Sequence, residues 1–154
     1  MEQTKGSPNK TARILEDVKI STKMKISALW AAAMFCYIYG DIMSFFIPGG
    51  YIAQSMAGKI GFFTVSQGTM LVISILDTIP CVMVFVTLIL KPKASRRANI
   101  IIGIYQTAIN SLVFLSTSWA YFIYFGIVES VLTILIVWYA WKWPSIEVSP
   151  TDKI

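Results

Sequence analysis

Residues 26–47 read ISALWAAAMFCYIYGDIMSFFI and include one charged side chain, an aspartate. About 20 predominantly apolar residues form a helix long enough to cross about 30 Å of hydrocarbon. Three other stretches also meet this requirement, at residues 69–90, 98–116 and 120–141. The polar residues at 116–119 separate the last two, because one helix of about 40 residues would extend to about 60 Å. The sequence therefore predicts an all-α integral membrane protein, a bundle of four transmembrane helices.

The composition agrees with a membrane protein of one domain. Of the 154 residues, 56% are hydrophobic and 14% are charged, whereas a typical soluble domain has about 25% charged residues. The net charge of +5 does not indicate nucleic-acid binding, because the basic residues flank apolar stretches, where Lys and Arg set membrane topology. The sequence contains no histidine, the commonest metal ligand and proton shuttle. We expect no cofactor.

The basic residues predict the orientation of the bundle. Six Lys or Arg residues precede the first span, four follow the second and two follow the fourth, whereas the first loop has one and the third has none. The positive-inside rule then places both termini in the cytoplasm. We predict a polar cytoplasmic segment at residues 1–25, a transmembrane domain at 26–141 and a cytoplasmic tail at 142–154. The expected location is the inner (cytoplasmic) membrane of a cell.

The outer loop and the aromatic residues fit this arrangement. The loop at residues 48–68 begins with Pro-Gly-Gly, which ends the first helix. Its mixture of apolar and small residues fits a short interfacial helix or a lid over the outer end, and equally a plain surface loop. Aromatic residues near span ends are expected to anchor the bundle at the membrane interfaces, with Trp30, Trp138, Trp141 and Trp143 inside and Trp119 and Tyr121 outside.

Three carboxylates lie inside the predicted spans, where an ionised side chain raises the free energy of insertion into the membrane. Asp41, Asp77 and Glu129 fall in the first, second and fourth spans. An Asp near the centre of a span costs roughly 2.5–3.5 kcal/mol on insertion scales, so three that faced lipid would cost on the order of 8–10 kcal/mol together. No Lys or Arg within a span could neutralise them. They are therefore expected to face the interior of the bundle.

The polar residues share a depth and a face. At about 1.5 Å of rise per residue, Asp41 lies about 9 Å, Asp77 about 12 Å and Glu129 about 14 Å below the outer ends of their spans. On the third span, Asn110 lies about 9 Å and Gln106 about 15 Å deep. Alternating steps of three and four residues define one seam on each helix, as in a left-handed bundle. The seam of the first span is Ser27, Trp30, Met34, Tyr37, Asp41 and Ser44, and that of the second is Gln67, Met70, Ser74, Asp77 and Cys81. The third span gives Asn99, Gly103, Gln106, Asn110, Val113 and Thr117, and the fourth gives Phe122, Gly126, Glu129, Thr133, Ile136 and Ala140.

This constellation predicts a polar pocket that opens toward the outer side. The three carboxylates would hold a proton, a metal cation or an organic ammonium, and Asn110, Gln106 and Tyr37 would orient a ligand. Pro80 follows Asp77 by three residues and frees a helix carbonyl, which makes it a candidate hinge. The leading hypothesis is a small protein that binds or transports a cation, a proton or a polar, amine-bearing molecule, and that forms a homodimer in the lipid bilayer.

Two other functions fit the same residues. In an accessory or structural membrane subunit, the polar seam would form hydrogen bonds between helices, and each bond would stabilise the packing by about 0.6 kcal/mol on average. In an intramembrane enzyme acting on a lipid or isoprenoid, two carboxylates would serve as acid and base. We favour binding over catalysis, because the sequence has no histidine and its two cysteines form no CxxC pair.

Several short motifs recur in a known kind of protein. They are KISALW at residues 25–30, YIYGD at 37–41 with Pro48-Gly49 after it, and Ile79-Pro80 leading into Lys91-Pro92-Lys93 and Arg97-Ala98-Asn99. In these residues the chain resembles a family of small prokaryotic four-span membrane proteins defined as a domain of unknown function. The resemblance implies four spans and an intact domain from about residue 15 to residue 143, and it supplies no activity.

Overall fold

The computed structural model describes residues 19–60, 63–115 and 118–144. The chain forms four long helices, α1 (Thr22–Ser44), α3 (Gln67–Ile89), α4 (Pro92–Leu115) and α5 (Ala120–Trp141). A short helix, α2 (Tyr51–Met56), and two strands, β1 (Lys59–Ile60) and β2 (Phe63–Thr64), connect α1 to α3. Most of the predicted polar N-terminal segment and of the C-terminal tail lies outside the described residues.

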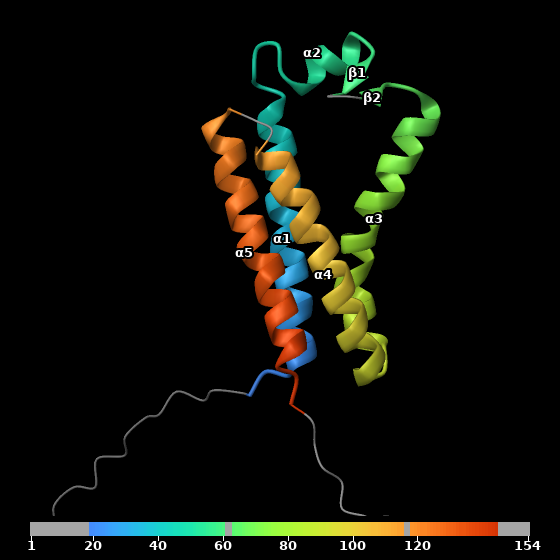
Figure 1. Ribbon diagram of the computed structural model, residues 1–154, viewed down its shortest axis with the longest axis vertical. Helices are drawn as coiled ribbons and strands as arrows, with labels where there is room; N and C mark the ends of the chain where they lie inside the picture. Colours follow the sequence, from blue (N-terminus) through green and yellow to red (C-terminus); the bar gives the residue numbers. More distant parts are fainter. Residues whose placement is uncertain (1–18, 61–62, 116–117, 145–154) are drawn as a thin grey trace, which may run out of the picture.

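The long helices run side by side, with α2 and the strands together at one end (Figure 1). We call this the hairpin end. The described chain begins at residue 19 and stops at residue 144 at the opposite end, which we call the terminal end. Successive long helices therefore alternate in direction.

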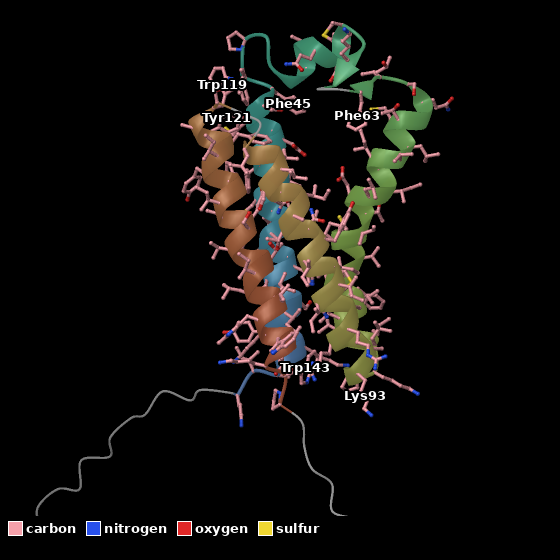
Figure 2. All side chains as sticks on the ribbon, viewed as in Figure 1. Phe45, Phe63, Lys93, Trp119, Tyr121 and Trp143 are labelled. Carbon is pink, nitrogen blue, oxygen red and sulfur yellow. The ribbon has the colours of Figure 1, made fainter. Side chains whose placement is uncertain are left out.

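Three of these helices, α1, α3 and α5, are long and apolar enough to cross a membrane. The fourth, α4, has 24 residues, and its first two turns carry Lys93, Arg96 and Arg97. Aromatic side chains lie at both ends of the bundle: Trp119 and Tyr121 at the hairpin end, and Trp143 at the terminal end (Figure 2). The apolar helices and the paired aromatic zones are typical of a membrane protein.

The helices begin where local sequence signals favour it. Ser21 caps α1 by accepting a hydrogen bond from the backbone N–H of Met24 at 3.4 Å, and Ser66 caps α3 in the same way. α4 begins at Pro92 rather than at residue 98, because proline suits the first position of a helix. α5 has the predicted bounds, and α4 and α5 are separate helices as predicted.

The connection between α1 and α3 holds a small hairpin that the sequence did not predict. β1 and β2 pair in antiparallel fashion, with Lys59 opposite Thr64. Gly58, just before β1, has a φ of 79°, a conformation that glycine adopts without strain. Of the alternatives for residues 48–68, a short helix is therefore correct, and it comes with two strands.

The helices contact one another in the order α1, α3, α4, α5 and back to α1. The contact between α4 and α5 is the most extensive, and that between α3 and α4 the least. Gly103 permits the first of these, because a Cβ atom there would lie 2.7 Å from Cγ2 of Val137. The predicted seams of α4 and α5 face the interior of the bundle, since Asn99, Gly103 and Asn110 are buried, as are Gly126, Glu129, Thr133, Ile136 and Ala140.

A buried polar network joins three helices near the terminal end. The indole N–H of Trp30 on α1 donates to the Asn99 Oδ1 atom at 2.7 Å, and the Thr87 hydroxyl on α3 donates to the same oxygen at 3.1 Å. The Asn99 amide in turn donates to the backbone carbonyl of Ser95 at 2.8 Å. Trp30 is 0% exposed, so the prediction that it anchors the bundle at a membrane interface is wrong. Its apolar ring packs in the core, and its N–H group has a protein acceptor.

α3 leaves the bundle at the hairpin end (Figure 1). Its buried residues are Pro80, Met83 and Thr87, all in its second half. The proline lies inside the helix, near its middle, where it removes a backbone hydrogen bond and bends the helix. The first half of α3 consequently diverges from α1 and α4, and this divergence makes room for the site described next.

Candidate ligand-binding cavity

A cavity of about 610 Å³ lies between the four long helices toward the hairpin end. Its walls come from the second half of α1, the first half of α3, the second half of α4 and the first half of α5. Ile52 and Ser55 of the short helix α2 also line it. α2 therefore forms part of the cavity wall, and a lid role for it stays a prediction.

All seven side chains that the sequence singled out line this one cavity: Tyr37, Asp41, Asp77, Pro80, Gln106, Asn110 and Glu129. They come from all four long helices. The estimate of a shared depth and a shared face thus corresponds to a shared cavity. Their roles in binding, in proton handling and in hinge motion remain predictions.

The three carboxylates differ in depth but share one electrostatic environment. Glu129 is 7% exposed, whereas Asp41 and Asp77 are exposed on the cavity walls. Asp41 interacts electrostatically with both of the others. Within the described residues, no Lys or Arg lines the cavity. The site is therefore suited to a positively charged ligand and not to an anion.

Among the described residues, no protein group donates a hydrogen bond to the side chain of any of these carboxylates. The hydrogen bonds formed at Asp41, Asp77 and Glu129 go to their backbone carbonyls, from Ser44, Cys81 and Thr133 respectively. A carboxylate that serves as glue between helices would accept a hydrogen bond from the neighbouring helix. These three instead present their oxygen atoms to the cavity.

The neutral polar residues form a connected group on the cavity wall. The Asn110 side-chain amide donates a hydrogen bond to the Tyr37 hydroxyl, which links α4 to α1. The Gln106 amide donates to the Asn110 Oδ1 atom at 3.4 Å. Because Tyr37 accepts the bond from Asn110, its own O–H group can donate to a ligand. The group is thus partly fixed by the protein and keeps one donor for the cavity.

Sequence reasoning assigned the polar residues but missed most of the apolar wall. Phe45, Phe125 and Ile52 line the cavity and fall on none of the predicted seams. Phe45 follows the last residue of α1, so the seam of that helix ends just before it. On the α3 seam, by contrast, Gln67 and Ser74 do not line the cavity, whereas Met70, Asp77 and Cys81 do.

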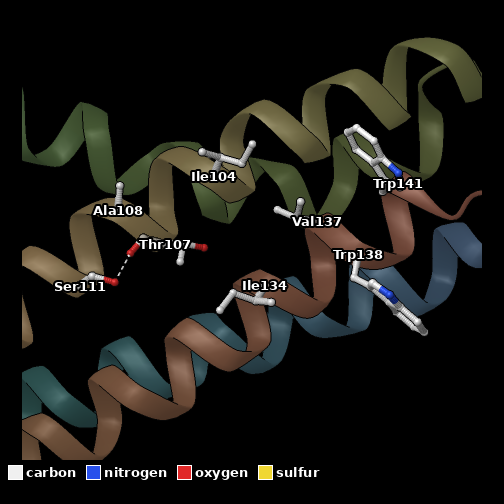
Figure 3. A pocket seen from close by; sticks show the side chains of 8 residues that line it. All are labelled: Ile104, Thr107, Ala108, Ser111, Ile134, Val137, Trp138 and Trp141. Carbon is white, nitrogen blue, oxygen red and sulfur yellow. Dashed lines mark hydrogen bonds between the residues drawn. The ribbon is translucent and has the colours of Figure 1, made fainter.

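A second, shallower cavity of about 530 Å³ lies on the outside of the bundle, between α4 and α5. Figure 3 shows its apolar walls, among them Ile104, Ile134 and Trp138. Its two hydroxyls bond within the protein: Ser111 donates to the Thr107 carbonyl and Thr107 to the Gly103 carbonyl, both at 2.8 Å. A groove with these walls can hold hydrocarbon, and none of the residues that line it is charged.

No group of three or more His, Cys, Asp or Glu side chains in the described part of the chain is arranged to hold a metal ion. Cys36 and Cys81 are free thiols. The cavity is thus not a preformed metal cage. Its carboxylates stand on separate helices and leave space between them for a larger ligand.

Comparison with known proteins gives a family and no activity. No curated protein and no solved structure matches the chain. The profile of a family of unknown function, DUF6326, matches residues 13–149. This range covers most of the chain and includes the four long helices and every residue that lines the cavity. The chain belongs to the family of unknown function DUF6326.

Proposed function

We propose that this protein crosses the inner membrane four times, with both termini in the cytoplasm, and binds or transports a cation or a polar, amine-bearing molecule in the cavity between its helices. The apolar character of α1, α3 and α5 supports three of the crossings. The position of α4 between α3 and α5 supports the fourth. Lys23 on α1 and Lys93 at the start of α4 belong to the terminal end, which supports a cytoplasmic location for that end.

One observation carries the functional part of the proposal. Asp41, Asp77 and Glu129 line one cavity, and no described residue donates a hydrogen bond to their side chains. Ionisable groups inside a membrane bundle are expensive, and they typically mark ligand, ion or proton pathways. Three of them on one cavity, without a protein cation, fit a site that receives its positive charge from outside the protein.

The network around Asn99 supports this assignment by contrast. There, Trp30, Thr87 and Ser95 are buried, and each has an acceptor: Trp30 and Thr87 donate to the Asn99 Oδ1 atom, and Ser95 donates to the Thr87 carbonyl. Burial with satisfied hydrogen bonds is typical of polar residues that stabilise the packing of helices. The carboxylates toward the other end of the bundle have no such partner among the residues that the structure describes, so helix packing alone does not account for them.

The first test is the thermal stability of the purified full-length protein with and without inorganic and organic cations. Binding to the native state stabilises the protein by mass action, about 2.7 kcal/mol at a free ligand concentration 100-fold above Kd. We expect at least one cation to raise Tm. The amide variants Asp41→Asn, Asp77→Asn and Glu129→Gln should remove or reduce that rise.

Ser111→Ala is the matched control, because Ser111 lies in the outer groove and its hydroxyl bonds to its own helix. It should leave the rise in Tm unchanged. If no cation moves Tm and the amide variants unfold like the parent, the carboxylates are not a cation site. The accessory-subunit function would then take precedence, and a co-purifying membrane partner would be sought.

Transport is separated from binding by flux into liposomes that contain the protein. A cation that raises Tm but does not cross a proteoliposome membrane would indicate a binding protein. For a transporter of this size we propose a homodimer, which the mass of the detergent-solubilised protein tests directly.

A further inference from the structure

Building on the proposed cation site, we infer that its ligand is an organic ammonium ion that carries an apolar group, and not a metal ion or a small hydrophilic cation. The cavity combines two kinds of wall. One is the set of carboxylates just described, and the other is a set of rings and apolar side chains with no role in binding a bare ion.

The apolar wall reaches around the carboxylates. Phe45, Phe122 and Phe125 line the cavity together with Met34, Ile73 and Ile109, so α1, α3, α4 and α5 all contribute. Aromatic rings attract an ammonium group through their negative faces, and they also bury the apolar group attached to it. A hydrated metal ion would leave this wall without a partner.

The volume indicates the size of the ligand. Cavities of about 300–1,000 Å³ accommodate drug-sized organic molecules, and this cavity is about 610 Å³. A single metal ion occupies a small part of such a space and needs several oxygen ligands at about 2.0–2.6 Å. The described residues include no group of three acidic, cysteine or histidine side chains arranged in that way.

The burial of the carboxylates indicates where the ammonium group of the ligand would bind. Glu129 is the most buried of the three, and Phe122 and Phe125 precede it on the same helix. Tyr37 stands near enough to interact with it electrostatically. The ammonium group would therefore lie near Glu129, with its apolar group against the phenylalanine rings. Asp41 on α1 and Asp77 on α3 line the cavity where the first half of α3 diverges from α1.

Three probes test whether the charge and the apolar group of the ligand both contribute to binding. The measurements use the full-length protein in lipid nanodiscs, with empty nanodiscs as the blank. Benzyltrimethylammonium has a fixed charge and an aromatic group, tetramethylammonium has the charge alone, and neopentylbenzene is the neutral shape analogue of the first. We expect benzyltrimethylammonium to bind about tenfold or more tightly than tetramethylammonium, given what burial of a ring contributes. Neopentylbenzene should bind the protein no better than empty nanodiscs.

Two variants test which residue binds the charge of the probe and which binds its apolar group. Glu129→Gln should weaken binding of both ammonium probes. Phe125→Leu keeps an apolar side chain in the packing and should weaken benzyltrimethylammonium several-fold while leaving tetramethylammonium unchanged. Circular dichroism and gel filtration establish that each variant is folded, and Phe122→Leu is the replacement if Phe125→Leu is not.

The outcomes separate this inference from the proposed function. If tetramethylammonium, Na⁺ or Mg²⁺ binds as tightly as the benzyl probe in a Glu129-dependent way, the cation site stands and the organic ligand class is wrong. If the benzyl probe binds but Phe125→Leu and Phe122→Leu have no effect, the apolar wall does not recognise it. If no cation binds in a Glu129-dependent way, both the inference and the proposed cation site fail.

Discussion

At the scale of the residue, an asparagine at position 99 and a glutamate at position 129 show two uses of polarity in one bundle. Asn99 is 0% exposed, and its side-chain oxygen accepts hydrogen bonds from two other helices. Glu129 is almost as buried, yet no described residue donates to its carboxylate. The asparagine stabilises the fold, whereas the glutamate is costly until it has a partner.

We expect Asn99→Ala to destabilise the protein without changing cation binding. The variant leaves the Trp30 N–H and the Thr87 O–H buried without their acceptor, at roughly 1–3 kcal/mol for each stranded donor. Denaturation in mild detergent measures the loss. In a Trp30→Phe background the same substitution should cost less, because one of the two donors has been removed. Equal costs in both backgrounds would argue against the hydrogen bond.

We also expect cation affinity to fall as the pH is lowered. Protons and the cation compete for the same carboxylate oxygens, so protonation removes the charge that binds the cation. Titrations of one fixed-charge ammonium probe from mildly alkaline to mildly acidic pH measure this effect. In Glu129→Gln, the remaining affinity should depend less on pH. An affinity that rises toward acid pH would contradict a carboxylate site.

At the scale of the element, α3 is the helix that departs from a regular bundle. Its second half is tied to its neighbours: Ser27 donates to the Val84 carbonyl at 2.7 Å, and Lys23 donates to the carbonyls of Leu88 and Leu90. Within the described residues, no side chain from 67 to 79 hydrogen-bonds another long helix. The bend near Pro80 lies between the tied half and the free half.

Pro80→Ala should straighten α3 and weaken ligand binding. The new backbone N–H can bond to the carbonyl of Leu76, and removal of a proline from a helix interior is worth up to about 3 kcal/mol. A straighter α3 moves Asp77 relative to Asp41 and alters the cavity. We expect a higher Tm and a weaker affinity for the ammonium probe. Thr78→Ala, which keeps the proline, is the control and should leave affinity unchanged.

Gly103→Ala should separate α4 from α5. The added Cβ would meet Val137 Cγ2 at 2.7 Å, and overpacking of this kind costs typically about 1–3 kcal/mol. Thermal unfolding measures the cost, and Val137→Ala should restore part of it. Gly68→Ala is the control, because its Cβ would meet nothing closer than 3.9 Å. Similar losses in both glycine variants would show that the close contact is not the cause.

At the scale of the whole molecule, the bundle has a closed end and an open end. The closed, terminal end contains the buried cluster of Ile26, Trp30, Met83, Ile136 and Ala140. The open, hairpin end contains the cavity. Lys and Arg residues lie mainly at the closed end, so the proposed topology turns the cavity toward the outside of the cell.

Cysteine labelling tests this topology in intact cells. In a background with Cys36→Ser and Cys81→Ser, Gln54→Cys places a thiol on α2, and Lys93→Cys places one at the start of α4. Both parent side chains are exposed. A membrane-impermeant maleimide should label Gln54→Cys in intact cells and Lys93→Cys after permeabilisation. Labelling of both in intact cells, or the reverse order, would overturn the orientation.

The sequence predicted this architecture unevenly, for physical reasons. Apolar length located the helices, and helical periodicity brought Asp41, Asn110 and Glu129 to one cavity, because both properties are local to a helix. Periodicity placed Trp30 on the seam of its helix, but it could not predict the hydrogen bond that the buried Trp30 N–H donates to Asn99, 69 residues away in the chain. Nor could it show that α3 diverges, because the direction of a bend at Pro80 is set by contacts between helices.

The divergence of α3 has an electrostatic consequence. Asp77 stands on the free half of α3 and Asp41 on α1. Both line the cavity and interact electrostatically, and two ionised carboxylates repel each other. While the cavity is empty, this repulsion would favour a position of the free half away from α1, which the bend at Pro80 permits. A bound cation would offset the repulsion and attract both carboxylates, so the free half of α3 would move toward α1. The position of the free half of α3 would then differ between the empty and the occupied cavity. A partner, or a second copy of the chain, could bind one of these conformations in preference to the other.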